Sequence, residues 1–370
     1  MTRIAVTGLG TIAPAAIAPI DRFDTAGLSA HAAALVRDFK PRDYIAPMKL
    51  RRMNQLSRLT VAAAKLALGE RKLPVGSGVA VGTAFGTVQT SVDYMKEYVE
   101  KGAALAPPQL FAESVANAPG SHVAIEHDLR GFNVTITQRE SSALAAAMYA
   151  CAQIAKGAAP AALIGGVDEV TEMVFSVLAR LGALSDRARP FDRRRDGFTL
   201  GEGSAVLVAE AEPSGEPLGW FSGFGIGRDT TATISDWGDD DARVADVMRA
   251  ALDDAGVDRV DAIFASANGS RRGDAVEARA IARLFGDNVP AVVATKGSFG
   301  EYAAAGALQL AAAFAALRDQ RLPASEGFEE TDLPIAPNSG GVAAALHNVL
   351  INSISAGGGI VCAVASATSS

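Results

Sequence analysis

Short apolar runs alternate with longer amphipathic segments along this chain of 370 residues. The runs predicted to be strands are residues 3–7, 78–81, 161–164, 205–209, 262–265, 291–294 and 359–365. The segments predicted to be helices carry apolar residues at helical spacing and are residues 55–68, 90–101, 142–156, 243–254, 275–284 and 303–317. Because alternating strands and helices bury their apolar faces against one another, this order predicts a layered α/β fold.

Two segments far apart in the chain resemble each other. FTLGEGSAVLVAEAE, which ends at Glu212, and NVLINSISAGGGIVCAVAS, near the C-terminal end, each read as two apolar strands joined by a glycine-rich bend. Between them, residues 213–217 hold Pro, Ser and Gly, which marks a boundary. The similarity predicts a duplicated α/β unit with halves at residues 1–212 and 217–370. The other interpretation, that α/β units in general end in such hairpins, stays open.

Composition limits the class of protein. Hydrophobic residues make up 49% of the chain and aromatic residues only 6%, with 37 glycines, which favours tight helix–sheet packing over a disordered or fibrous chain. The longest apolar stretch, residues 302–317, contains Gln309 and is shorter than the ~20 residues that a membrane-spanning helix needs. No charged leader precedes the first strand-like run, so we expect no signal peptide and no membrane partner.

Cysteine content and charge predict the compartment and exclude one class of partner. Cys151 and Cys362 make neither a disulfide framework nor a metal set, so we expect a reducing cytoplasm and no metal site. The formal net charge is −7, whereas nucleic-acid binding requires a basic surface. The one dense basic patch lies at residues 187–195, so we expect no nucleic-acid partner.

Several motifs follow one another along nearly the whole chain. The first half holds RIAVTGLGTIAP, VAVGTAFGTVQ, SVANAPGSHVAIEHDLRGFN and ARPFDRRRDGFTLGEGSAVLVAE, and the second half holds DAVEARA and ATKGSFGEYAAAG. Together they resemble the β-ketoacyl synthase family of the thiolase fold over residues 3–366, and the RPFD–RDGF–GEG run is the most specific match. The resemblance implies two similar halves in a five-layered α/β/α/β/α sandwich that usually dimerises. Activity must be argued separately from the site.

The resemblance also indicates where a condensing enzyme would carry its catalytic groups. Relatives hold the acyl chain on a cysteine at a helix N-terminus and use two histidines for the decarboxylation. Here Glu140 occupies the cysteine position, Asn268 the first histidine position, and Glu301, five residues after the retained Lys296, the second. A carboxylate is a poor acyl carrier, and asparagine cannot cycle a proton near neutral pH. No part of the catalytic triad is therefore expected to be intact.

Two further observations concern the surroundings of these positions. The phenylalanine that gates acyl entry in active relatives is replaced by Ala356, although the glycine-rich bend remains. The four histidines of the chain, His31, His122, His127 and His347, match no catalytic position. His122 and His127 flank the loop before the nucleophile position, and we expect structural roles for these two.

Glu140 and Glu301 are close together in the family's geometry, and Lys296 is the one buried cation that the motifs place near them. We hypothesise that Lys296 bridges the two carboxylates and forms a structural ion cluster. The physical reason is that an unpaired buried charge costs several kcal/mol, unless one carboxyl group is protonated.

A ketosynthase-like subunit without its nucleophile resembles the chain length factor of type II polyketide synthases. The resemblance implies a heterodimer with an active ketosynthase, in which a tunnel for the growing polyketide or polyene chain runs into the interface. The family's tunnel-lining helix corresponds to residues 107–117, and the candidate tunnel residues are Leu110, Phe111, Glu113, Ser114 and Val115. Acyl carrier protein would dock mainly on the ketosynthase, and no cofactor is implied.

Details of the resemblance refine this interpretation. Glu113 and Ser114 stand where the factors of aromatic polyketides carry bulky aromatics, which predicts a longer or differently shaped product chain. The NAPGSHVAI loop is similar to that of aryl-polyene and other highly reducing systems. Better-known factors carry glutamine where this chain has Glu140. The basic patch at residues 187–195 either assists carrier docking or, as RPFD and RDGF do in the family, acts structurally.

Two other functions remain open. Glu140 or Glu301 could serve as an acid or base in a remade enzyme site, such as a malonyl-carrier-protein decarboxylase, although the histidines that this reaction uses in relatives are missing. The chain could also be a homodimeric, non-catalytic protein that binds an acyl ligand, because closed twofold assemblies are the commonest oligomers. The sequence identifies neither the product nor the ketosynthase partner.

Overall fold

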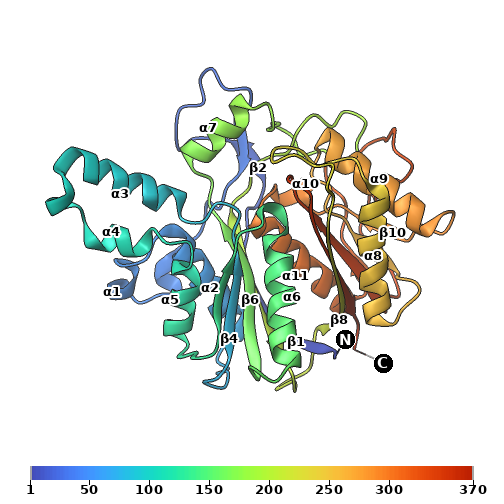
Figure 1. Cartoon of the computed structure of the whole chain (residues 1–370), viewed down its shortest axis with the longest axis horizontal. Helices are drawn as coiled ribbons and strands as arrows, with labels where there is room; N and C mark the ends of the chain where they lie inside the picture. Colours follow the sequence, from blue (N-terminus) through green and yellow to red (C-terminus); the bar gives the residue numbers. More distant parts are fainter. Residues whose placement is uncertain (1, 369–370) are drawn as a thin grey trace.

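The strands and helices of the computed structural model alternate as the sequence predicts (Figure 1). The structure describes residues 2–368, without the side chain of residue 303. The helices are α1 (Pro47–Leu50), α2 (Gln55–Leu68), α3 (Val88–Lys101), α4 (Pro108–Glu113), α5 (Ala118–Glu126), α6 (Ser142–Ala155), α7 (Glu172–Arg180), α8 (Asp241–Ala255), α9 (Arg271–Phe285), α10 (Lys296–Phe299) and α11 (Ala303–Asp319). Short 3-10 helices lie at Pro41–Asp43, Ala103–Leu105 and Arg139–Ser141.

The strands form one large sheet and two small ones. The large sheet contains β1 (Ile4–Ile12), β4 (Gly78–Gly82), β5 (Asn133–Ile136), β6 (Ala161–Asp168), β7 (Gly203–Glu210), β8 (Gly219–Arg228), β9 (Ala262–Phe264), β10 (Ala291–Val293), β13 (Asn348–Ile354) and β14 (Gly359–Ser366). The small sheets pair β2 (Ile17–Pro19) with β3 (Ala32–Ala34), and β11 (Arg321–Leu322) with β12 (Val342–Ala343).

The two halves of the large sheet have the same topology. The order of strands is β5-β4-β6-β7-β1 in the first half and β10-β9-β13-β14-β8 in the second. In the first half, β7 pairs antiparallel with both β1 and β6, and in the second half β14 pairs antiparallel with both β8 and β13. The remaining pairings within each half are parallel. β1 and β8 pair antiparallel and join the halves. The predicted duplication of an α/β unit is therefore confirmed.

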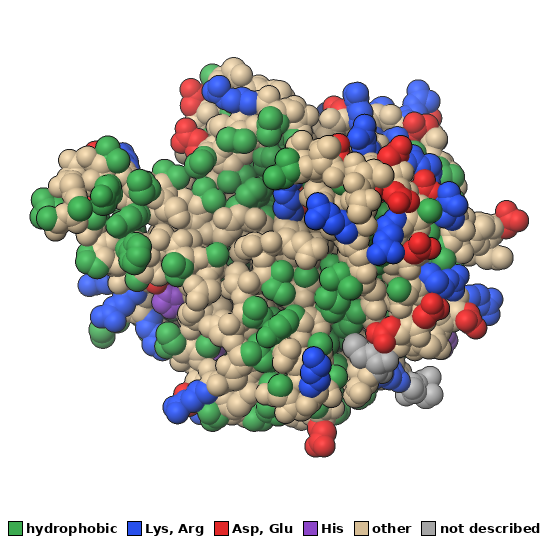
Figure 2. All heavy atoms as spheres, viewed as in Figure 1, with side chains coloured by type: hydrophobic (Ala, Val, Ile, Leu, Met, Phe, Trp, Pro, Cys, Tyr) green, Lys and Arg blue, Asp and Glu red, His purple; other side chains and the backbone are tan. Residues whose placement is uncertain are grey.

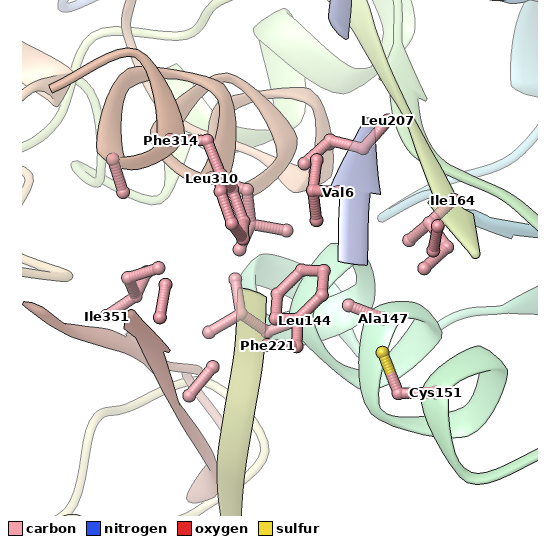
Figure 3. Close-up of a cluster of buried hydrophobic side chains, with 14 of the residues drawn as sticks. Val6, Leu144, Ala147, Cys151, Ile164, Leu207, Phe221, Leu310, Phe314 and Ile351 are labelled. Atoms are coloured by element: carbon pink, nitrogen blue, oxygen red, sulfur yellow. The ribbon is translucent and has the colours of Figure 1, made fainter. Parts of the chain in front are cut away.

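Helices form three layers, and the two halves of the sheet lie between them. α2 packs on β1 and β7 with α5 beside it, and α8 and α9 cover the second half. α6 and α11 lie between the halves, where Leu144 and Phe314 meet Leu207 of one half and Ile351 of the other (Figure 3). This is the expected α/β/α/β/α arrangement.

The predicted hairpin repeat was right for the second half and wrong for the first. β13 and β14 are antiparallel and joined by a short turn. In the first half, β7 pairs with β1 and β6, and residues 198–202 form no strand of the sheet. Phe198 and Leu200 instead make isolated bridges to Leu184 and Glu301. Nevertheless, the connection between β7 and β8 contains the predicted boundary at residues 213–217.

The length of a helix decides whether it could cross a membrane. The longest helix given above, α11, has 17 residues. Within residues 2–368, no helix combines the length and the apolar character that crossing a bilayer requires.

Candidate functional site

The four predicted centre residues and the gate position lie in connecting segments that follow strands of the large sheet. Glu140 lies in the short 3-10 helix that follows β5 and precedes α6, and Asn268 follows β9. Lys296 opens α10 after β10, and Glu301 lies between α10 and α11. Ala356 lies in the turn between β13 and β14. The fold thus brings residues from four separate motifs to one place, and we call Glu140, Asn268, Lys296 and Glu301 the degenerate centre.

Lys296 and Glu301 form a buried ion pair, and Asn268 makes a hydrogen bond to it. Lys296 Nζ lies 2.7 Å from Glu301 Oε2, and Asn268 Nδ2 donates to the same oxygen over 2.7 Å. The other oxygen, Glu301 Oε1, accepts the backbone N–H of Tyr302 at 2.8 Å. Lys296 and Glu301 are each only 1% exposed. Because the charges are paired and both carboxylate oxygens accept hydrogen bonds, the arrangement meets the conditions for a stable buried ion pair.

Glu140 lies in the same region but outside the ion pair. Its Oε2 accepts the backbone N–H of Ala356 at 3.2 Å, and its carbonyl accepts the Ser353 hydroxyl at 3.0 Å. Among residues 2–368, no ion pair joins Glu140 to Lys296, which pairs with Glu301. The hypothesis that Lys296 bridges both carboxylates therefore holds for Glu301 but not for Glu140.

The electrostatic environment favours the protonated form of Glu140. Burial and the nearby Glu301 carboxylate raise the pKa of Glu140 from 4.5 to about 7, against the opposing effects of a backbone hydrogen bond, Lys296 and Arg139. The physical reason is that one buried cation compensates one carboxylate, and it already pairs with Glu301. Protonation is the second way of avoiding an unpaired buried charge.

Two further buried acids hold the loops around the centre. Asp274 accepts the backbone N–H groups of Asn268 at 3.0 Å and Phe191 at 2.7 Å, and burial raises its pKa to about 6. Glu277 accepts the backbone N–H of Ser266 at 2.8 Å, and burial raises its pKa to about 7. Their hydrogen bonds tie the RPFD loop and the loop after β9 to α9.

The geometry provides no acyl carrier at the centre. The chain's cysteines are Cys151 and Cys362, and both side chains are fully buried in the core. Burial raises the pKa of both thiols, which disfavours the nucleophilic thiolate. Figure 3 places Cys151 on α6, among apolar side chains. The groups at the centre can hold hydrogen bonds and a proton, but none of them is a thiolate or an imidazole.

Sequence reasoning missed Tyr302, which borders the centre. Its ring makes edge contacts with Phe85, at a centroid distance of 4.6 Å, and with Phe198, at 5.5 Å. Its backbone φ is 145°, a value that favours glycine. The available signal was an aromatic residue directly after Glu301 in a chain that is poor in aromatics.

An apolar groove lies beside Tyr302, between α3 and α7. It has a volume of about 670 Å³. Among the residues that line it are Phe85, Val88, Val92, Met95, Ser114 and Met173. Ser114 is therefore the predicted tunnel residue that lies in the groove.

The other predicted tunnel residues lie differently. Glu113 is buried, and its carboxylate bonds His122 Nε2 at 2.8 Å, which gives this histidine the structural contact expected for it. Phe111 is 60% exposed and packs against Tyr94, with ring centroids 5.6 Å apart. Leu110 is half-buried and Val115 is exposed, and neither lines the groove.

Three arginines of the basic patch, Arg193, Arg194 and Arg195, form ion pairs with acidic side chains. Arg193 pairs with Glu330 at 3.0 Å, and Arg195 pairs with Asp332. Arg194 pairs with Asp192, which also accepts the backbone N–H of residue 329. These contacts fasten the RPFD–RDGF loop to residues 329–332, which favours the structural interpretation of the patch over carrier docking.

Two family models match the chain in the order expected from its halves. "Beta-ketoacyl synthase, N-terminal domain" matches residues 16–214, and "Beta-ketoacyl synthase, C-terminal domain" matches residues 218–329. A curated relative is the 3-oxoacyl-[acyl-carrier-protein] synthase 2 of Coxiella burnetii, which is 29% identical over 91% of this chain and 92% of its own length.

Solved structures give the same result. One described as the ishigamide ketosynthase/chain length factor superposes with a TM-score of 0.91 at 28% identity and covers 100% of both chains. A β-ketoacyl synthase from Burkholderia phymatum STM815 gives a TM-score of 0.89 at 25% identity, again with 100% coverage of both chains. Since the family models cover most of the sequence and the fold agrees over its full length, the chain belongs to the β-ketoacyl synthase family.

Proposed function

We propose that the chain is a non-condensing partner subunit, a chain length factor, which pairs with an active ketosynthase and shapes the tunnel for its product. The observation that carries this proposal is the degenerate centre. By the resemblance, Asn268 and Glu301 stand at the positions of the proton-handling histidines and Glu140 at that of the nucleophile, and Glu301 is held in a buried pair with Lys296. Condensation requires a thiolate to carry the acyl group and donors that stabilise the enolate, and this set of residues offers no thiolate.

The surface of the α3–α4 arm supports the pairing. Figure 1 shows that this arm projects from the body of the molecule, and Figure 2 shows hydrophobic side chains gathered over it. Its large exposed apolar residues are Val92, Met95, Tyr98, Val99, Leu105 and Phe111. Contiguous exposed apolar surface of this kind marks interaction sites. The likeness to a structure described as a ketosynthase/chain length factor points to a partner of the same fold.

The apolar groove supports the role in tunnel formation. It opens between α3 and α7 beside the projecting arm, so a partner that packs on the arm would cover it. Covering would turn the groove into an enclosed apolar channel suited to a polyketide or polyene chain. Acyl carrier protein would dock mainly on the ketosynthase, because this chain carries a net charge of −7 and three arginines of its basic patch are paired with acidic side chains.

Co-expression with a ketosynthase encoded beside it tests the proposal. The expected result is a one-to-one complex that elongates acyl thioesters, whereas this chain alone does not. Replacing the nucleophile of the ketosynthase should abolish elongation by the complex and leave its assembly unchanged. Elongation by the purified chain alone would overturn the proposal. Release of carbon dioxide from malonyl carrier protein by the isolated chain would instead indicate a decarboxylase. A stable homodimer that does not bind the ketosynthase would indicate an acyl-binding protein.

A further inference from the structure

We infer that Tyr302 is a plug that separates the apolar groove from the degenerate centre. What this means for an acyl chain rests on the proposed function. An acyl chain held in the groove cannot enter the degenerate centre of this subunit, so the groove alone sets the space available to the acyl chain.

The first observation is the position of the ring. Tyr302 is 3% exposed, and its ring packs edge-on against Phe85, which lines the groove. The backbone N–H of the same residue donates to Oε1 of the preceding residue, Glu301, at 2.8 Å. Tyr302 therefore contacts the groove wall with its side chain and the degenerate centre with its backbone.

The charges around the phenol agree with this position. Burial raises the pKa of Tyr302 well above its ordinary value, and Glu140, Glu301 and Asp168 raise it further, against a smaller opposing effect of Arg139. Both burial and these three carboxyl groups therefore favour the neutral form of the phenol.

The second observation is the backbone. Its φ of 145° is a conformation that side chains other than glycine's rarely adopt, and such strain persists only where the surrounding structure enforces it. Phe85 and Phe198 hold the ring by edge contacts, and it belongs to a core cluster with Phe175 and Leu184. A large side chain is thus kept at a position where the backbone favours glycine, which points to a role for the ring itself.

The test places a reporter thiol in the centre. In Glu140→Cys, residue 140 keeps its buried position, and alkylation by a decyl-chain iodoacetamide is followed by peptide mapping of the isolated full chain. With Tyr302 in place, the thiol should be protected as Cys151 and Cys362 are, both of which are fully buried. In Glu140→Cys/Tyr302→Gly, alkylation should be at least ~10-fold faster, because the reagent no longer waits for local unfolding. Glycine also suits the backbone at this position.

Two controls separate the plug from general loosening. Glu140→Cys/Tyr302→Phe keeps the ring and should remain protected. Glu140→Cys/Phe314→Leu weakens the buried core without touching the groove and should also remain protected. Rapid alkylation of Glu140→Cys alone, or equal rates with and without the ring, would overturn the inference.

A second measurement needs no cysteine. If Tyr302→Gly admits water to the centre, Glu140 becomes better solvated, and its ionisation should cost less stability. Glu140→Gln should then change the pH dependence of stability less in the Tyr302→Gly protein than in the wild type. An unchanged difference would contradict the inference. Both measurements use the isolated chain, so their outcome is independent of whether the proposed heterodimer forms.

Discussion

Replacing Glu140 by glutamine should make the protein more stable at alkaline pH and leave it nearly unchanged at acidic pH. Glutamine has the shape of the carboxylic acid and retains an oxygen that can accept the Ala356 N–H, but it cannot ionise. The substitution therefore removes the titration of Glu140 and little else.

The magnitude follows from the pKa. The folded-state pKa of about 7 lies above the ordinary value of 4.5, so between these values the folded state holds a proton that the unfolded chain has released. Stability must then fall as the pH rises, and the loss is complete only above the folded-state pKa. At about 1.4 kcal/mol for each tenfold change in acid strength, ionisation of Glu140 lowers the free energy of unfolding by roughly 3 kcal/mol at alkaline pH.

Urea unfolding of the isolated chain between about pH 5 and pH 8 measures this effect. The advantage of Glu140→Gln over wild type should grow by roughly 2 to 3 kcal/mol across the range. Other groups that act on Glu140, namely Glu301, Lys296 and Arg139, are present in both proteins, and the protein concentration must be held fixed because association adds to apparent stability. Glu212→Gln, at an exposed position, controls for the loss of one carboxyl group. Parallel curves for wild type and Glu140→Gln would refute the reasoning.

Three further changes test other parts of the structure. Lys296→Met should lower the free energy of unfolding by about 3 to 5 kcal/mol, because it leaves the Glu301 carboxylate buried and unpaired, and Lys296→Met/Glu301→Leu should recover part of the loss in urea melts. Ser114→Trp should fill the groove and shorten the products of the complex in mass spectrometry, and unchanged product length would remove Ser114 from the tunnel. Val99→Asp, at a side chain that is 76% exposed, should weaken the complex in co-purification while the thermal midpoint of the isolated chain stays unchanged.

Most of the regular structure could be predicted because its signals are local. The helix predicted at residues 55–68 has those bounds in the structure: Asn54 caps its N-terminus, and Gly69 follows its last residue with a positive φ. β8 was missed because its alternating glycines depress the apparent strand propensity. Those glycines face α8: a Cβ on Gly225 would lie 2.2 Å from the Val247 carbonyl oxygen, so close packing of the helix explains them.

The composition of the candidate site could be predicted, but not its pairing. The resemblance to the family, rather than the residues alone, predicted that Glu140, Lys296 and Glu301 lie near one another. In the structure Lys296 pairs with Glu301, which lies five residues further along the same motif, and not with Glu140 from a distant motif. The sequence did not show which of the two carboxylates the lysine would contact. Tyr302 was missed for a related reason, since its importance arises from contacts with Phe85 and the groove rather than from its neighbours in sequence.

Hydrogen bonds at and near the degenerate centre also connect the two halves of the fold. Glu140, from the first half, accepts the Ala356 N–H in the β13–β14 turn of the second, and the Ser353 hydroxyl bonds the Glu140 carbonyl. Asp168, at the end of β6, accepts the N–H of Ala304 at 3.2 Å at the start of α11. Such bonds resist separation of the halves whether or not chemistry takes place between them. The proposed partner subunit would need the fold only as one wall of a channel, and these connections would keep that wall intact without any chemistry between the halves.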